Sequence, residues 1–207
     1  MGKVGCAMAS LSVYWRLACA LRRNIYAGRH GKDENEMTQM LEALVQRRSV
    51  RTFADKPVGE EMVQLLLRAA QCAPSAGNEK PWHFVVLQDR NVITRIPEFH
   101  PYSAVLLKCS LAIALFADLR EERFPGNWPL DCAAATQNIL LQAQALHLGA
   151  VWLGIYPEKE RMKCLEELLE VPEDLKAFSV VAVGHPAEKP PIREESFDVS
   201  RVHYNHW

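Results

Sequence analysis

The sequence predicts an α+β fold in which helices alternate with short buried strands, and three observations support this class. Several segments carry apolar residues at the three- and four-residue spacing of one helical face. Short apolar runs that contain β-branched residues lie between them and are typical of buried strands. Of the 207 residues, 49% are hydrophobic and 24% are charged, which is enough apolar material for a substantial core.

The helices and strands are expected in alternation from Met37 onward. The segments with helical spacing are 37–46, 59–72, 131–148 and 158–169. Pro74 closes the second helix, and Gly149 is expected to end the third as its C-terminal glycine. The third helix is apolar nearly all round, which predicts a central helix covered on every side. The predicted strands are 83–88, 111–117, 150–155 and 178–183.

The first 36 residues differ from the rest and are expected to form a flexible or dispensable extension before a domain at 37–207. Arg16 interrupts the apolar stretch 11–21, and the positive charge follows it, which fits neither a secretory signal nor a membrane span. A membrane-surface helix remains an alternative for this stretch. The polar run 31–36 is typical of a linker.

Charge and cysteine usage exclude several classes of function. A formal net charge of -1 gives no global electrostatic reason to bind nucleic acid or an anionic membrane. The six cysteines form no CxxC pair, so free thiols in a reducing cytoplasm are expected. No HExxH motif is present, and His203 and His206 lack a third ligand at helical spacing, so no metal site is expected.

Three segments carry residues suited to binding a cofactor. The first, RRSVR at 47–51, offers three guanidinium groups and a hydroxyl, which match a phosphate or the polar edge of a ring. A solvated basic turn is the alternative. The second, PSAGN at 74–78, follows a helix; its glycine permits close backbone approach, although an ordinary helix-to-strand connection would look the same. The third is VWLG at 151–154, a strand ending in a glycine whose backbone N–H groups could face a ligand or simply allow packing.

Taken in order, these segments resemble the nitroreductase family of flavoproteins, and the resemblance covers residues 37–207. The matching stretches are RRSVRTF at 47–53, APSAGNEKPWHFVV at 73–86, DCAAATQNILLQAQALHLGAVWLG at 131–154, VAVGHPAEKPP at 181–191 and RVHYNHW at 201–207. The resemblance implies a three-layer α/β/α sandwich around a mixed, mainly antiparallel sheet. It also implies an intertwined homodimer, with the helix from Asp131 at the subunit interface.

The resemblance further implies which residues hold flavin mononucleotide (FMN). The arginine-rich segment binds the phosphate, the ribityl chain and the pyrimidine edge, the PSAGN loop lies over the flavin from the other subunit, and the VWLG strand presents backbone N–H groups to flavin N5 and O4. The residues concerned are Arg47, Arg48, Ser49, Arg51, Pro74, Ser75, Asn78, Leu153 and Gly154.

Two positions depart from the family pattern. Lys80 stands where glutamine is common, so a cation could face the substrate or the cofactor. Ser196 stands where the family often has a phosphate-binding arginine. Arg193 is the predicted replacement, with Arg201 as an alternative, and a phosphate held mainly by Arg47 and Arg51 is another.

The implied activity is FMN-dependent oxidation of NAD(P)H coupled to reduction of a small organic acceptor, by ping-pong transfer of hydride through flavin N5. The acceptor class stays open among nitroaromatics, quinones, enones and similar molecules, and NADH is not distinguished from NADPH. Because the flavin carries the chemistry, no catalytic side chain is predicted. The alternative is a flavin-binding carrier or sensor without turnover. The apolar tail, with Val202, Tyr204 and Trp207, is expected to pack on a partner subunit rather than on its own domain.

Overall fold

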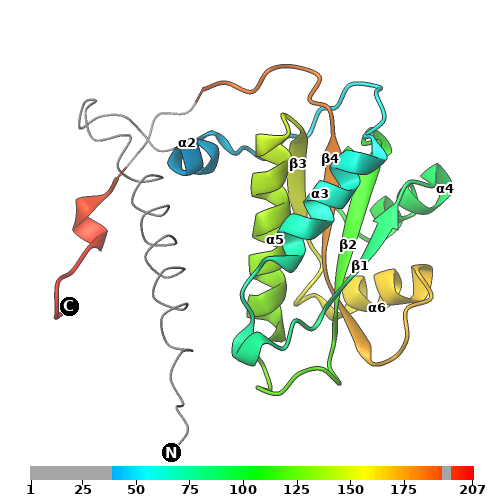
Figure 1. Cartoon of the computed structure of the whole chain (residues 1–207). Coiled ribbons are helices and arrows are strands. Elements are labelled where there is room, and N and C mark those ends of the chain that lie inside the picture. Colours follow the sequence, from blue (N-terminus) through cyan, green and yellow to red (C-terminus); the bar gives the residue numbers. More distant parts are fainter. Residues whose placement is uncertain (1–38, 193–196) are drawn as a thin grey trace, which may run out of the picture. The chain divides into compact units, whose positions relative to one another are not determined.

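A computed structural model describes residues 39–192 and 197–207 (Figure 1). The helices are α2 (Gln39–Gln46), α3 (Glu60–Gln71), α4 (Arg90–Ile93), α5 (Trp128–Ala145) and α6 (Lys159–Leu168), and the strands are β1 (Trp82–Leu87), β2 (Leu111–Asp118), β3 (Gly149–Gly154) and β4 (Leu175–Gly184). Short 3-10 turns are η1 (Ala76–Asn78), η2 (Ile96–Glu98), η3 (Ala104–Leu107) and η4 (Val199–Arg201). The α+β prediction is confirmed. The proposed extension and the predicted phosphate ligand Arg193 lie outside the described residues.

The four strands form one sheet in the order β1-β2-β4-β3, and all neighbouring strands run antiparallel. Strand β3 therefore pairs with β4 on one side and forms an edge of the sheet on the other. Along that edge, Ser49 makes an isolated parallel bridge to Ala150. The four described strands are thus antiparallel throughout, and this isolated bridge adds a parallel contact at the edge of the sheet.

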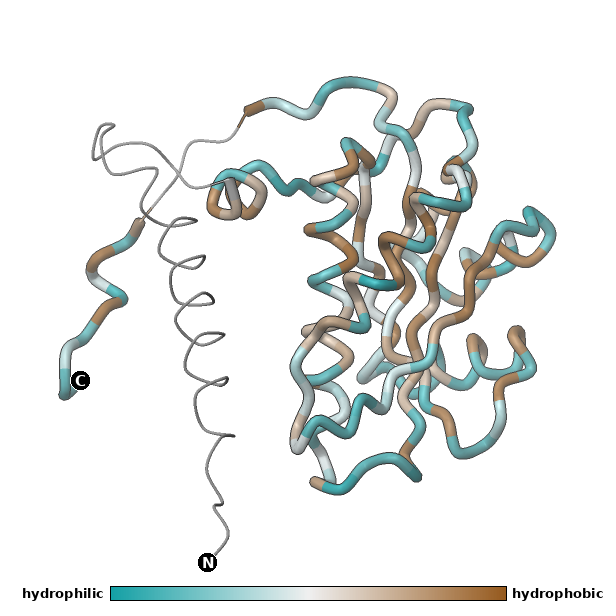
Figure 2. The backbone as a smooth tube through the Cα atoms, viewed as in Figure 1, coloured by the Kyte–Doolittle hydropathy of each residue, from teal (hydrophilic) through white to brown (hydrophobic). Residues whose placement is uncertain are grey.

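Both faces of the sheet are covered, which gives the three layers. On β2, Ile113 and Leu115 pack into the core shared with α3 and α5, whereas Ala114 and Phe116 pack into the core that includes Leu165 of α6. Side chains alternate between the faces of a strand, so a strand buried on both sides becomes a continuous apolar run. The hydrophobic colouring along the strands in Figure 2 shows this pattern.

A β-bulge places an aromatic cluster beside the start of α5. The register between β2 and β4 shifts between Leu115 and Phe116, whose partners are Ser179 and Ala177, so Phe178 has no partner. The extra residue turns the Phe178 ring toward the α5 side of the sheet. There its ring centroid lies 6.1 Å from those of Trp128 and Tyr156 and 5.6 Å from that of Trp152.

The C-terminal cap of α5 differs from the prediction. The helix ends at Ala145, and His147, with φ 57°, occupies the left-handed position assigned to Gly149. The N–H groups of His147 and Leu148 donate to Gln144 and Ala143 carbonyls at 3.1 and 2.8 Å, which is a Schellman cap. Gly149 instead begins β3, where a Cβ atom would lie 2.6 Å from Cγ1 of Val50. Close packing rather than helix termination requires this glycine.

Helix α5 is not covered on every side within its own chain. Its buried residues lie on one face and are Asp131, Cys132, Ala135, Thr136, Ile139, Leu140 and Ala143. On the remaining surface Ala134, Gln137 and Leu141 are half-buried, and the Leu130 side chain near the start is 68% exposed. One chain alone thus leaves part of α5 uncovered, and coverage of the remainder by a partner subunit stays a prediction. An apolar surface remains on α5 for another partner to cover.

The C-terminal segment 197–207 exposes all its side chains, and that of Trp207 is fully exposed. Asp198 caps the short turn η4 by accepting a hydrogen bond from the Ser200 N–H, and it pairs with Arg201 at 2.9 Å. The His203 and Trp207 rings stack with centroids 4.4 Å apart. Packing of this tail on a partner subunit stays a prediction.

Candidate functional site

The free edge of β3 presents backbone groups in a defined direction. The N–H of Val50 donates to the Ala150 carbonyl at 3.0 Å, so the backbone of Ala150 points away from β4. The pointing direction alternates along an antiparallel strand, which places the Gly154 groups on the same outer edge and the Leu153 groups on the β4 side. The Gly154 carbonyl confirms the direction because it accepts from two side chains outside the sheet. Of the two predicted N–H donors, Gly154 is the one that faces outward.

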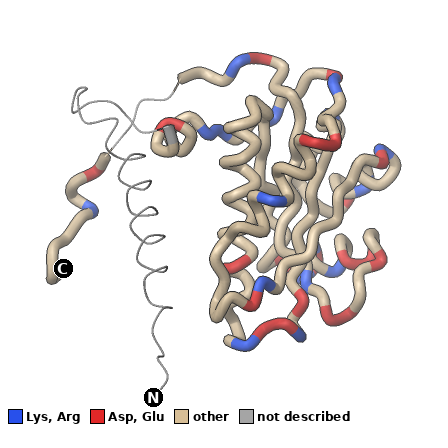
Figure 3. Tube along the Cα trace, viewed as in Figure 1, with Lys and Arg blue, Asp and Glu red and all other residues tan. Residues whose placement is uncertain are grey.

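A basic segment lies at the beginning of this edge, directly after α2 (Figure 3). Arg47 and Arg48 are half-buried, and Arg51 is exposed with one long hydrogen bond, 3.4 Å, to the Ser49 carbonyl. Within residues 39–192 and 197–207, none of these three guanidinium groups forms an ion pair. Half-buried arginines without a carboxylate partner leave their donor forks available for an anion.

The end of the edge is open. A Cβ atom on Gly154 would meet no atom within 4 Å, so the space beside this residue is empty. From Ala150 to Gly154 the strand rises about 13 Å, at about 3.3 Å per residue. The edge of β3 therefore has arginines at its beginning, and at Gly154 it has an outward N–H group beside open space.

Two side chains that sequence reasoning missed fix the backbone at Gly154. The buried His100 ring places Nε2 3.0 Å from the Gly154 carbonyl, and its Nδ1 accepts from the Tyr102 N–H at 3.3 Å, so Nε2 is the donor. Desolvation by burial lowers the pKa of His100, which favours this neutral form. The Arg161 guanidinium donates to the same carbonyl at 3.3 Å and lies 5.8 Å from the centroid of the exposed Tyr102 ring.

The PSAGN loop lies at the N-terminal end of α5. The Asp131 carboxyl accepts a hydrogen bond from the Ala76 N–H at 3.0 Å, and Ser75 Oγ accepts from the Lys80 N–H at 2.9 Å. Pro74, Asn78 and Lys80 are exposed, and Ser75 is half-buried. The loop residues are thus presented outward while the loop backbone is tied to α5.

One chain does not bring the loop to the arginines. The loop is attached at Asp131, in the first turn of α5, whereas the arginine segment meets Ala150, just beyond the last turn. Between Asp131 and Ala145 the helix rises about 21 Å, at about 1.5 Å per residue. Ser75 and Asn78 therefore lie at the opposite end of α5 from Arg47 and Arg48.

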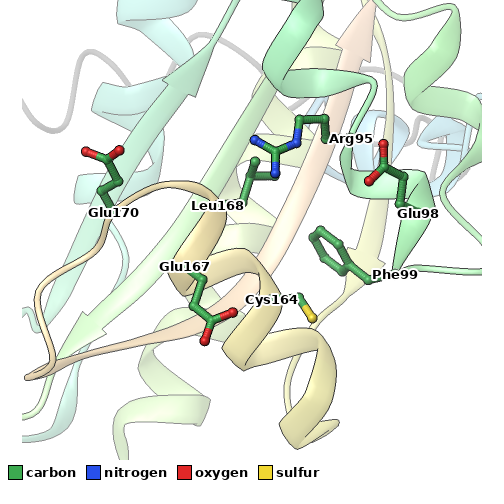
Figure 4. A pocket seen from close by; sticks show the side chains of 7 residues that line it. All are labelled: Arg95, Glu98, Phe99, Cys164, Glu167, Leu168 and Glu170. Carbon is green, nitrogen blue, oxygen red and sulfur yellow. The ribbon is translucent and has the colours of Figure 1, made fainter.

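A hollow of about 300 Å³ lies elsewhere, between η2 and α6 (Figure 4). It is lined by Arg95, Glu98, Phe99, Cys164, Glu167, Leu168 and Glu170 and contains none of the predicted site residues. The pKa of the Cys164 thiol is raised by desolvation and by the nearby Glu160 carboxylate, which disfavours the nucleophilic thiolate. This hollow offers no evident chemistry.

Comparison with known proteins identifies the family. A sequence model described as Nitroreductase family matches residues 44–108 and 100–185, which include the free edge of β3 and the PSAGN loop. The chain belongs to the nitroreductase family. The family resemblance inferred from the motifs is confirmed, and the chain is accordingly an oxidoreductase.

Two archaeal relatives are similar over most of their length. A candidate NADH dehydrogenase/NAD(P)H nitroreductase of Methanothermobacter thermautotrophicus is 45% identical over 168 residues, covering 81% of this chain and 87% of the relative. One of the same description from Archaeoglobus fulgidus is 42% identical over 174 residues, covering 83% and 100%. These matches lie in the part of the chain that carries the arginine segment, the loop and β3.

Solved structures agree on the fold. A candidate NADH oxidase from Clostridium acetobutylicum has a TM-score of 0.77 at 42% identity, covering 80% of this chain and 99% of that protein. A nitroreductase from Desulfovibrio desulfuricans, solved in complex with FMN, has a TM-score of 0.70 at 30% identity, covering 83% and 99%. Within the described residues, no helix is both long and apolar enough to cross a membrane.

Proposed function

We propose that this nitroreductase-family chain binds FMN along the free edge of β3 and uses it to pass reducing equivalents from NAD(P)H to a small organic acceptor. The observation that carries the proposal lies along the edge of β3. At one end are three arginines that form no ion pair with any residue in 39–192 or 197–207, and at the other end are an outward N–H and open space. A cofactor with a phosphate at one end and a planar ring at the other would match these two ends of the edge. The FMN complex of the Desulfovibrio relative supports the same choice of cofactor.

The chain's own residues would divide the binding as follows. Arg47, Arg48 and Arg51 offer charge-assisted hydrogen bonds to the phosphate and polar ring edge, and Ser49 adds a hydroxyl. The outward-pointing Gly154 N–H would donate to flavin N5, with Leu153 next to it in the strand. No arginine is needed at Ser196 if the three N-terminal arginines hold the phosphate.

When bound, the isoalloxazine ring supplies the redox chemistry by accepting and returning hydride. The chain contributes the backbone N–H of Gly154 as a hydrogen-bond donor. Its direction is fixed because His100 and Arg161 donate hydrogen bonds to the carbonyl of the same residue. Because such a donor is already oriented, no reorganisation free energy is needed when negative charge develops on a ring. Alternating use of one open face by NAD(P)H and the acceptor would give ping-pong kinetics.

We further propose that the site is shared between two chains. The opposite placement of the loop and the arginine segment along α5 supports this, since within one chain the loop lies far from the arginines that would hold the phosphate. The exposed Leu130 and half-buried Leu141 on α5, with the apolar tail, supply surface for a partner. Ala135 and Ile139 of the same helix are buried in the chain's own core and are not available to a partner.

The acceptor is proposed only as a class: a nitroaromatic, quinone, enone or similar small molecule. We place the protein in the cytoplasm because buried Cys109 and Cys132 are free thiols. The test is the absorption spectrum of the purified protein, followed by NADH or NADPH under anaerobic conditions. Near-ultraviolet and blue flavin bands that bleach and return with an acceptor are expected. Bands that do not bleach would favour a carrier or sensor, and a colourless protein that FMN cannot reconstitute would exclude flavin binding.

A further inference from the structure

Two buried carboxyl groups lie at the attachment of the PSAGN loop. The Glu79 side chain is 8% exposed and that of Asp131 is 5% exposed. Glu79 Oε2 accepts hydrogen bonds from the N–H groups of Arg123 and Phe124 at 2.7 and 3.3 Å, and Asp131 Oδ1 accepts from the Ala76 N–H. Each carboxyl thus uses one oxygen to hold a backbone segment.

The second oxygen of each group, Glu79 Oε1 and Asp131 Oδ2, is buried and has no hydrogen-bond partner. Both groups are also tied to one residue, because the Glu79 N–H donates to the Ala76 carbonyl at 3.0 Å while Asp131 holds the Ala76 N–H. A buried polar atom without a partner is costly, and two adjacent ionised carboxylates repel each other. A single proton between them removes both costs.

The surroundings do not supply a cation instead. None of the described lysines or arginines forms an ion pair with either carboxyl. Desolvation by burial raises the pKa of Asp131 most strongly, and the carboxylates of Glu79 and Glu122 raise it further. The Glu122 group faces the pair from the segment before α5, where it accepts from the N–H groups of Gly126 and Trp128. The hydrogen bond from the Ala76 N–H lowers the pKa of Asp131, and the positive end of α5 acts in the same direction.

The loop needs such an anchor because its backbone is strained. Gly77, Asn78 and Lys80 have φ values of 52°, 57° and 52°, and the left-handed region is unfavourable for a residue other than glycine. The Phe124 ring packs directly on Gly77, where a Cβ would lie 2.3 Å from its Cε2. Glu79 therefore fastens the loop to the segment that covers it, and Asp131 fastens it to α5.

We infer that Glu79 and Asp131 share one proton at pH values where ordinary carboxyls are ionised, and that this protonated pair holds the PSAGN loop in its flavin-covering conformation. The inference rests on the proposed flavin site for its functional consequence, but not for the proton itself. Loss of the proton leaves two like charges at the anchor and loosens the loop. Both residues are positioning residues.

The proton is tested first in the flavin-free protein. At pH 5.5, more than one pH unit above ordinary aspartate and glutamate pKa values of about 3.9 and 4.3, the infrared spectrum should show a carboxylic acid C=O stretch. The band should vanish in the Glu79→Gln/Asp131→Asn double variant and persist in Glu61→Gln, an exposed control. Absence of the band from the wild type, or its survival in the double variant, would overturn the shared proton.

The anchor is tested by hydrogen exchange of the amides of residues 75–80 and by FMN affinity, each followed from pH 5.5 upward. In the wild type, exchange should speed up beyond its intrinsic pH dependence, and the FMN dissociation constant should rise by up to about tenfold per pH unit as the pair loses its proton. Glu79→Gln mimics the protonated group, since its amide oxygen accepts and its NH₂ donates to Asp131, and should remove both dependences. An identical pH dependence in Glu79→Gln would refute the anchoring role. If no variant binds FMN, the proposed function fails, while the infrared and exchange results still decide the inference.

Discussion

Replacing Gly154 with alanine separates flavin binding from folding. A Cβ atom at this position would meet no atom of the chain within 4 Å, and the residue is not in the left-handed region. The flavin-free variant should therefore fold normally, and its free energy of unfolding should stay within about 1 kcal/mol of the wild type, with a slight gain from reduced unfolded-state entropy. The matched control is Gly184→Ala, where a Cβ would lie 2.9 Å from Phe53 Cδ1. That variant should lose about 1–3 kcal/mol of stability.

The effect on flavin is expected to be the reverse. If the ring lies against Gly154, the new methyl group occupies its space, and overpacking costs of about 1–3 kcal/mol correspond to a rise of roughly 5- to 150-fold in the FMN dissociation constant. Quenching of flavin fluorescence on titration into flavin-free protein measures the constant, and urea unfolding measures stability. Wild-type affinity in Gly154→Ala would refute the placement of the flavin at the end of β3.

Four other predictions follow from the same structure. Arg47→Ala should weaken FMN binding about ten- to hundredfold, from loss of about 1.5–3 kcal/mol, whereas Arg95→Ala in the unrelated hollow should not change it in the same fluorescence titration. Leu141→Glu should shift sedimentation toward monomers that have lost flavin, because it charges the uncovered face of α5; dimers that retain flavin would contradict this. His147→Gly should raise the thermal midpoint by relieving about 1 kcal/mol of left-handed strain, and an unchanged or lower midpoint would count against it. A hydrogen bond from the Arg120 guanidinium lowers the pKa of Asp118 from 3.8 to about 2. The ionised Asp118 therefore stabilises the folded protein fully above pH 3.8, and this contribution is lost as the pH falls toward 2. Asp118→Asn should flatten that part of the pH dependence of the free energy of unfolding, measured with urea.

Much of the fold was predictable because its signals are local. Helical spacing and apolar runs located α3, β1, β2 and β4 to within two residues at most ends, except that β4 begins at Leu175 rather than at 178. The bulge at Phe178 explains that difference, since it breaks the alternation from which the start of the strand would be read. The cap of α5 was mispredicted because His147 takes a conformation that glycine usually supplies.

The candidate site was predictable only where it is continuous in sequence. The segments around Arg47, Ser75 and Gly154 carry family motifs, so the sequence alone predicts them as site residues. His100 and Asp131 were not assigned roles, because each acts through a contact with a residue more than fifty positions away. A lone histidine after a proline-containing turn has no distinctive pattern, and the buried Asp131 was read as the start of a helix. Tertiary folding alone brings such groups to their partners.

A mixed dimer tests the central claim most directly. One chain would carry Arg47→Ala and Arg48→Ala, and the other Pro74→Trp, an exposed loop position where a large side chain blocks the flavin without entering the core. Neither homodimer should retain FMN. In the mixed dimer, one site combines both defects. By the twofold symmetry of such an interface, the other site combines the intact arginines of one chain with the intact loop of its partner. We therefore predict about one FMN per two chains. A mixed dimer without flavin would contradict the account, because it would mean that each site is built within a single chain.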